Sequence, residues 1–190
     1  MLGPIASRRK KAHVISGFTL IELLIVLVIL GIALTLAMPS YSQWIQNTHI
    51  RNTTESIAHG MQRARAEAVS RNTTVAFTLT PGGGVFWTIV QTDDNTVIES
   101  RPAAEVSQSV TLTVSPIPAP PQDPPKTVTY GNLGNVVANA DGTTPITQVD
   151  VDSSALPAQD SRDLRIVVGV GGMVRMCDPN VSSASDPRHC

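Results

Sequence analysis

The chain has 190 residues, of which 42% are hydrophobic and 15% are charged, and its formal net charge is −1. A length of this order suits one domain of about 100–200 residues together with a short additional segment. From Ser40 onward there are 10 Lys and Arg residues against 14 Asp and Glu residues, a net of −4. This balance argues against a general nucleic-acid-binding surface, because such surfaces need a basic face.

An apolar run from Phe18 to Met38 follows four cations at residues 8–11, and its only charged residue is Glu22. At about 1.5 Å of helix rise per residue, the run is long enough to cross the ~30 Å hydrocarbon core of a bilayer. A secretory signal fits poorly, because its apolar region has about 7–15 residues before a small-residue cleavage site, and Thr35-Leu36-Ala37 is a weak candidate. A plain anchor fits the length but does not explain Glu22, because charged residues inside a bilayer are costly and rare.

The segment "GFTLIEL" at residues 17–23 resembles the class III signal of type IV prepilins and type II secretion pseudopilins. The resemblance implies that a prepilin peptidase removes residues 1–17 by cutting after Gly17, and then methylates the new amino terminus at Phe18. It makes Glu22 the fifth mature residue, which is the position of the family's acidic residue. It also implies a single-pass anchor in the inner membrane, a periplasmic domain, and other pilins or pseudopilins as partners.

Glu22 has a ready electrostatic partner under this interpretation. The new amine at Phe18 lies four residues, or about one helical turn, before Glu22, so the carboxylate can pair with the amine of its own or a neighbouring subunit. Such a pair is stronger in a low dielectric than in water, although desolvation offsets part of the gain. We therefore interpret Glu22 as a residue that sets register during assembly and not as a catalyst.

Apolar residues continue at helical spacing beyond the run and predict one helix from Phe18 to about Ser70. Residues 18–38 would lie in the membrane or the filament core, and residues 39–72 would form an amphipathic continuation whose apolar stripe covers a sheet. The stripe consists of Ile50, Ile57, Met61, Ala64 and Ala68. Gly31 and Pro39 also match the prepilin pattern, and they are the expected positions of a kink because Pro39 lacks an N–H group.

After Asn72 the apolar residues alternate with period two, which predicts antiparallel strands within residues 73–190. The expected strands are residues 75–80, 85–90, 96–100, 110–114, 127–130, 146–151 and 164–170. Residues 115–126 contain six prolines and are expected to form an exposed loop, with a proline-rich ligand for a partner as the alternative. The expected fold class is α+β, with the long helix packed on a two-layer antiparallel β-sandwich.

The order of long helix, "ARAEAVSRN" at residues 64–72 and then strands resembles the GspH/FimT group of minor pilins and pseudopilins. The stretch "GGMVRMCDP" at residues 171–179 resembles the C-terminal region of the type IV pilus members. By this resemblance the chain is a noncatalytic minor pilin that helps initiate or cap a type IV pilus. The H-type minor pseudopilin of a type II secretion system is the alternative.

Cys177 and Cys190 are the only cysteines, and in a periplasmic domain we expect them to form a disulfide. The bond would close residues 177–190 into a loop of about 14 residues and add roughly 3 kcal/mol to stability in the chain-entropy model. Metal binding by these cysteines and His189 is the alternative, but a usual zinc site needs more ligands than this tail offers.

The sequence contains no motif of a serine hydrolase, a zinc protease or a phosphate-binding loop. We therefore expect no enzymatic activity, no cofactor and no metal, and an anchored periplasmic enzyme is the weakest hypothesis. A calcium cluster is the alternative to solvated loop charges for five aspartates. These are Asp141, Asp150, Asp152, Asp160 and Asp163.

Some FimT-type members bind DNA through a C-terminal Gly-Arg-x-Arg motif. The corresponding stretch here is Gly172-Met173-Val174-Arg175, in which only the last arginine is present. Because loss of a phosphate contact weakens DNA binding, we favour a structural role and treat Arg175 as the candidate DNA contact. The arginines available to compensate are Arg162, Arg165 and Arg188.

Overall fold

The structure is a computed structural model that describes residues 18–80, 84–116 and 126–190. The predicted leader, with Gly17, and most of the proline-rich segment lie outside the described residues. The chain divides into two compact units with the boundary between Pro39 and Ser40. Each unit is described by itself.

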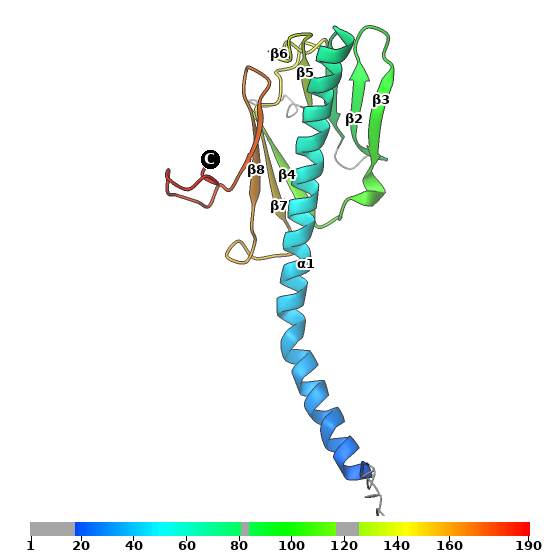
Figure 1. Ribbon diagram of the computed structural model, residues 1–190, viewed down its shortest axis with the longest axis vertical. Helices are drawn as coiled ribbons and strands as arrows, with labels where there is room; N and C mark the ends of the chain where they lie inside the picture. The colour runs from blue at the N-terminus through cyan, green and yellow to red at the C-terminus, as the bar shows by residue number, and fades with distance from the viewer. Residues whose placement is uncertain (1–17, 81–83, 117–125) are drawn as a thin grey trace, which may run out of the picture. The chain divides into compact units, whose positions relative to one another are not determined.

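The first unit contains the N-terminal part of helix α1, which runs from Leu20 to Arg71 (Figure 1). Every large apolar side chain from Phe18 to Met38 is at least 50% exposed. In the described part of the chain, α1 is the one helix long and apolar enough to cross a membrane. The predicted long helix is confirmed. It continues through Gly31 and Pro39 without a break in its assignment, and the kink at these residues stays a prediction.

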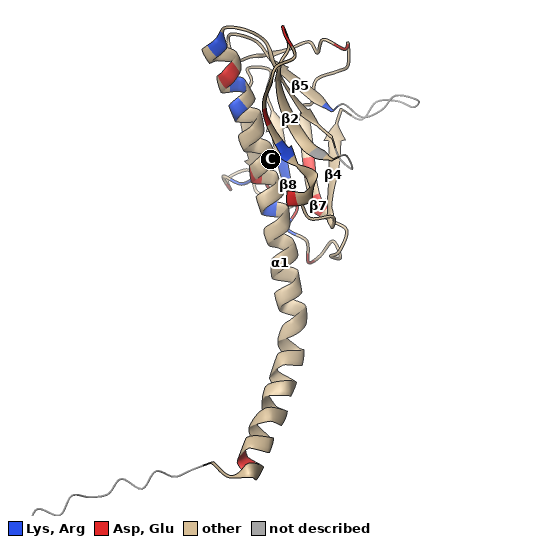
Figure 2. Cartoon of the chain, turned by 90° about the vertical axis from the view of Figure 1, so that its right-hand side faces the viewer, with Lys and Arg blue, Asp and Glu red and all other residues tan. Residues whose placement is uncertain are grey.

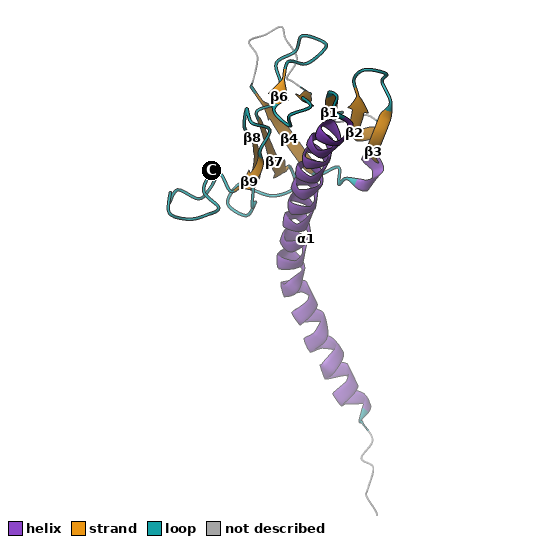
Figure 3. Ribbon diagram, turned by 45° about the horizontal axis from the view of Figure 1, so that its top comes forward, coloured by secondary structure: helices purple, strands orange, loops and turns teal. Residues whose placement is uncertain are grey.

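Two antiparallel sheets form most of the second unit, with the strand orders β3-β2-β1-β5-β6 and β4-β7-β8-β9. Figure 3 shows β2 and β3 on one side of α1 and β7, β8 and β9 on the other. The strands are β1 (Val75–Leu79), β2 (Val85–Gln91), β3 (Val97–Pro102), β4 (Val110–Ser115), β5 (Thr127–Tyr130), β6 (Val136–Val137), β7 (Gln148–Ser153), β8 (Leu164–Val168) and β9 (Val174–Cys177). A short 3-10 helix, η1 (Ala103–Glu105), follows β3. The predicted α+β class is confirmed.

Strands β6 and β9 are absent from the sequence-based prediction. Strand β6 has only two residues, which is too short for a period of two to be recognised. Strand β9 pairs with β8 in register Ile166 to Met176. Its Val174 and Met176 do alternate with the exposed Arg175, but this short pattern was missed in the sequence analysis. The predicted strand at 164–170 ends earlier, at Val168, because the N–H of Gly172 donates to the carbonyl of Gly169 (2.8 Å) in the turn that joins β8 to β9.

The second unit has its own hydrophobic core. The predicted helical stripe is confirmed, because all five of its side chains are 0% exposed. It packs with apolar residues of both sheets in one cluster, which includes Phe77 of β1, Tyr130 of β5, Val149 of β7 and Ile166 of β8. Among the described residues, every buried apolar residue lies at Ile50 or later. This unit therefore buries a core without help from the first.

Gly60 allows the helix to approach the first sheet closely. A Cβ atom added at this position would lie 2.6 Å from Cε2 of Phe77 and 3.4 Å from Cε2 of Trp87. The rings of Phe77 and Trp87 are 5.7 Å apart between centroids, and Trp87 donates a hydrogen bond from Nε1 to Oγ of Ser56 (3.1 Å). A larger residue at position 60 must displace this aromatic pair.

We expect Gly60→Val to lower the free energy of unfolding of a fragment from Ser40 onward by about 1–3 kcal/mol, because it overpacks the core. At about 2–4 °C per kcal/mol, the melting temperature should fall measurably in a circular dichroism scan. Ala66→Val is the matched control, since Ala66 is exposed on the same helix and should lose only the ~0.7 kcal/mol of helix propensity. Equal losses in the two variants would contradict the close-approach interpretation.

Candidate functional site

Thr19 caps the start of helix α1 in the first unit. Its Oγ1 accepts a hydrogen bond from the backbone N–H of Glu22 (3.2 Å), and its carbonyl accepts one from the N–H of Leu23 (3.1 Å). Thr19 and Glu22 therefore have the spacing of a capping box. This explains why the helix begins at Leu20 and not at Phe18. The sequence analysis missed this role of Thr19, although a threonine three residues before a glutamate at the start of an apolar run is a recognisable signal.

Phe18 and Glu22, the described residues predicted to act in processing and assembly, are both exposed. Phe18 is 82% exposed, and the Glu22 side chain has no ion pair or hydrogen bond to another residue that the structure describes. Gly31 has no atom within 4 Å of the position that a Cβ would occupy. Among the described residues, none therefore fills the space around these three positions.

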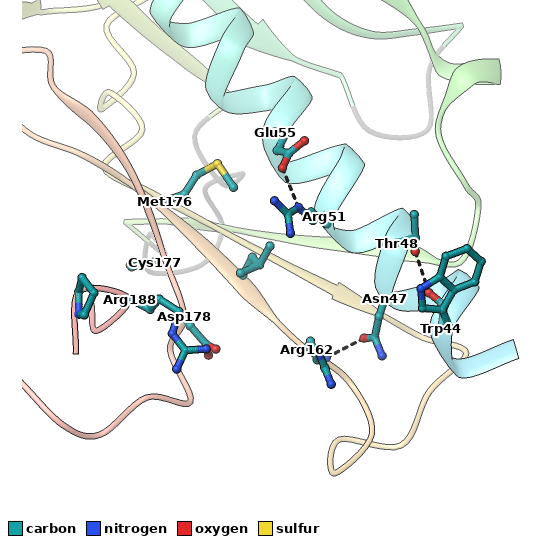
Figure 4. A pocket seen from close by; sticks show the side chains of 12 residues that line it. Trp44, Asn47, Thr48, Arg51, Glu55, Arg162, Met176, Cys177, Asp178 and Arg188 are labelled. Carbon is teal, nitrogen blue, oxygen red and sulfur yellow. Dashed lines mark hydrogen bonds and ion pairs between the residues drawn. The ribbon is translucent and has the colours of Figure 1, made fainter. Parts of the chain in front are cut away.

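A groove with a volume of about 500 Å³ lies in the second unit, between helix α1 and the segment that includes β9 and the disulfide loop (Figure 4). On the helix side, Nε of Arg51 pairs with Oε1 of Glu55 at 2.8 Å. On the other side, the backbone N–H of Arg162 donates to Oδ1 of Asn47 (2.9 Å). The other lining residues are Trp44, Thr48, Leu164, Met176, Cys177, Asp178, Pro187 and Arg188. Mixed charges and apolar side chains suit contact with another chain better than chemistry on a small substrate.

The C-terminal segment is held by a disulfide between Cys177 and Cys190, as predicted, so neither thiol remains to bind zinc. The N–H of Asp178 also donates to the carbonyl of Arg188 (2.7 Å). Arg175 adds two further bonds, from Nη1 to the carbonyl of His189 (3.2 Å) and from Nη2 to the carbonyl oxygen of Cys190 (2.9 Å). The guanidinium therefore supports the loop that the disulfide closes.

The glycine of the Gly-Arg-x-Arg-like stretch has a structural task. Gly172 has a φ of +77°, and a Cβ there would lie only 1.8 Å from the carbonyl oxygen of Gly134. Arg65 joins the same two loops, donating from Nε to the Gly134 carbonyl (2.8 Å) and from Nη2 to the Gly171 carbonyl (3.3 Å). Met173, where the motif has its first arginine, is 67% exposed. The stretch thus forms a tight backbone corner at Gly172 and lacks the first cation of the motif.

The other candidate arginines are largely engaged within the domain. Arg165 forms an ion pair with Asp150, and Arg188 forms one with Asp186. These contacts leave Arg162 as the candidate whose guanidinium has no hydrogen bond or ion pair among the described residues. One such arginine does not make a basic face.

The five aspartates considered for calcium do not converge on one site. The described residues contain no group of three His, Cys, Asp or Glu side chains that could hold a metal ion. Only Asp152 and Asp163 interact with each other: burial and the neighbouring Asp152 carboxylate raise the pKa of Asp163. Although burial opposes it, hydrogen bonding, including that from Ser161 (2.6 Å), lowers the pKa of Asp152. The calcium alternative is therefore wrong for the described part of the chain.

Comparison with known proteins gives a family match over most of the domain. The profile of the family described as "Type II transport protein GspH" matches residues 53–172, and that of the "Prokaryotic N-terminal methylation motif" matches residues 14–38. A search of curated proteins finds no match.

Two solved structures illustrate the likeness of the fold. The type IV minor pilin FimU of Pseudomonas aeruginosa strain PAO1 is 10% identical with a TM-score of 0.50, and the match covers 74% of this chain and 99% of that chain. The minor pseudopilin EpsH from the Type 2 Secretion System of Vibrio cholerae is 14% identical with a TM-score of 0.47, covering 70% and 99%. At 10% identity the match to FimU bears on the fold alone, and the match to EpsH, with a TM-score below 0.5, carries no argument.

We expect Arg175→Ala to lower the free energy of unfolding of the fragment from Ser40 by about 0.5–1.5 kcal/mol, because the loop loses two hydrogen bonds. Arg162→Ala is the control and should change stability less.

Titration with duplex DNA at two salt concentrations should give only weak binding by the wild-type fragment, since electrostatic attraction to phosphates dominates such binding. Micromolar or tighter binding that falls steeply with salt and is abolished by Arg175→Ala would contradict the structural assignment.

Proposed function

The chain belongs to the GspH family, a pilin and pseudopilin family of noncatalytic structural proteins, and we propose that it is a minor pilin that helps initiate or cap a type IV pilus. We infer that its apolar segment, residues 18–38, crosses the inner membrane once and that residues 40–190 lie in the periplasm. Processing by a prepilin peptidase and assembly with other pilins are parts of this proposal.

The observation that carries the proposal is the exposure of the apolar segment next to a methylation motif. Burying one large apolar side chain is worth about 1.5–3 kcal/mol, and from Phe18 to Met38 all such side chains are at least half exposed. A helix that is apolar all round requires a bilayer or neighbouring apolar helices. A pilin meets both conditions in turn, since its helix leaves the membrane to enter the filament core.

The proposed assembly step uses few groups. Cleavage after Gly17 would create an amine on Phe18, close to the N-terminal end of α1. Thr19 already caps this end by accepting a hydrogen bond from the N–H of Glu22, so the first turn keeps its geometry while the Glu22 carboxylate stays exposed to solvent or to a neighbour. In the low dielectric of a filament core, an uncompensated carboxylate is costly. Registers that bring each Glu22 to an amine are therefore favoured over registers that do not.

A minor pseudopilin of a type II secretion system is the second candidate, and the match to the GspH profile favours it. The C-terminal "RMCDP" stretch with its closing Cys190 supports the pilus instead, because it resembles the type IV pilus members. Deletion of the gene in its native bacterium distinguishes the two. The pilus proposal expects fewer sheared surface pili with unchanged protein secretion, and the secretion proposal expects the reverse.

Processing should remove the first 17 residues. We expect intact-mass spectrometry of the membrane fraction to give a mature chain that begins at N-methylated Phe18. Gly17→Val should block the cut, because the peptidase is expected to need a residue without a bulky side chain before the cleaved bond. Gly31→Val is the control, since Gly31 lies inside helix α1, 14 residues after Gly17, and should leave cleavage intact. A mature chain that begins near Met38 would instead support a secretory signal.

Glu22→Gln should leave cleavage and the folded domain intact but deplete the protein from sheared filaments. Glutamine also serves in a capping box, so this variant removes the charge while preserving the helix start. Glu22→Asp is the control that keeps a carboxylate, and it should recover part of the incorporation. Wild-type amounts of Glu22→Gln in filaments, measured by quantitative immunoblotting, would show that the charge is not needed for incorporation.

A further inference from the structure

Two aromatic side chains of helix α1 are exposed near the start of the second unit. Tyr41 is 63% exposed and Trp44 is 64% exposed, and their ring centroids are 6.0 Å apart. Residues three apart lie on the same face of a helix. The chain's other tryptophan, Trp87, is only 5% exposed, so the domain has an interior that accepts this side chain and yet leaves Trp44 outside.

The same turns also carry amide side chains that hold the domain. Oε1 of Gln46 accepts a hydrogen bond from Oγ of Ser109 (2.6 Å), and Nδ2 of Asn47 donates to the carbonyl of Asp160 (3.1 Å). At 100° per residue, Gln46 lies about 140° around the helix from Tyr41, whereas Asn47 lies only about 60° from Trp44, which lines the groove. The domain therefore binds this part of the helix through amides and leaves both aromatic rings more than half exposed.

The helix itself carries no charged residue for several turns on the N-terminal side of the aromatic pair. From Leu23 to Ile50 the sequence has no Asp, Glu, Lys or Arg, and the corresponding length of helix is tan in Figure 2. The first charges after it are Arg51 and Glu55, which pair with each other at 2.8 Å. Tyr41 and Trp44 thus stand between the end of the apolar run at Met38 and the first ion pair.

The spacing along the chain matches the headgroup layer of a bilayer. Three and six residues separate Tyr41 and Trp44 from Met38 in helix α1, which is about 4.5 and 9 Å of helix rise. A bilayer is ~40–45 Å thick including headgroups and ~30 Å thick in its hydrocarbon core, so each interface is about 5–8 Å deep. Tyr and Trp are enriched at this depth, because their rings are apolar and their O–H and N–H groups need polar partners.

We propose that Tyr41 and Trp44 bind the headgroup layer of the lipid bilayer on the domain's side and fix the depth of the subunit before it assembles. This inference rests on the proposed function, because it takes residues 18–38 as a membrane span. Lipid is the occupant because the aromatic face directly follows that span in the chain, so a neighbouring lipid surface is unavoidable while the subunit is anchored.

The test uses the full-length mature chain in phosphatidylcholine and phosphatidylglycerol vesicles. Trp87→Phe leaves Trp44 as the sole tryptophan, and its emission is compared in vesicles whose lipids are brominated at carbons 6,7 or at carbons 11,12 of the acyl chain. We expect the shallower bromines to quench about half of the emission and the deeper ones less, since an interfacial ring lies near the headgroups. Trp44→Phe, which retains the buried Trp87, should show little quenching.

If Trp87→Phe impairs folding, the wild-type signal minus that of Trp44→Phe reports the same residue without a change in the core. Flotation of the vesicles measures membrane insertion independently of fluorescence. A chain that floats while Trp44 is not quenched by either bromolipid overturns this inference and leaves the proposed function intact, and it would assign the aromatic face to a neighbouring subunit. A chain that does not float overturns both.

Discussion

The cost of keeping one apolar helix out of water governs this molecule. A segment in which every large side chain is exposed cannot remain in an aqueous compartment, because apolar surface in water costs about 25 cal/mol per Å². The segment needs either lipid or other helices of the same kind. The first unit therefore cannot bury its apolar surface within the monomer, whereas the second unit buries a core of its own.

The same helix meets this constraint differently along its length. Toward its C-terminal end, small residues and a narrow apolar stripe allow it to lie against two sheets, and Gly60 brings it close enough to touch Phe77. Toward its N-terminal end it offers no face that this domain could bury, and its polar feature is a capped first turn that carries Glu22. The C-terminal part of helix α1 is thus part of a buried core, and its N-terminal part is an exposed apolar segment that needs an apolar environment.

Periodicity in the sequence predicted the helix, its buried stripe and seven of the nine strands found in the described residues, because these depend on which side chains face a core. It did not predict β6, which two residues and a single neighbouring strand define. It also missed what depends on backbone contacts between distant loops, such as the approach of Gly172 to Gly134 and the bonds from Arg65 that join them. Such contacts leave no repeating pattern, since a single glycine or arginine has many uses.

The sequence motif makes Arg175 a candidate DNA contact, and the structure shows that its guanidinium also supports the disulfide loop. The two hydrogen bonds of Arg175 could not be predicted from the sequence, because they join residues 14 and 15 positions apart. The predicted disulfide, by contrast, followed from the presence of two cysteines in a domain expected to be periplasmic. Covalent and periodic constraints can be read from a sequence, while single polar contacts require the fold.

The contact between Gly172 and Gly134 also bears on how related sequences are searched for DNA receptors. In this chain Gly172 is required by the close approach of loops from the two sheets, whatever the neighbouring positions bind. The next position, Met173, is exposed and has no such constraint. A glycine at this corner is therefore weaker evidence of DNA binding than the arginines that follow it would be.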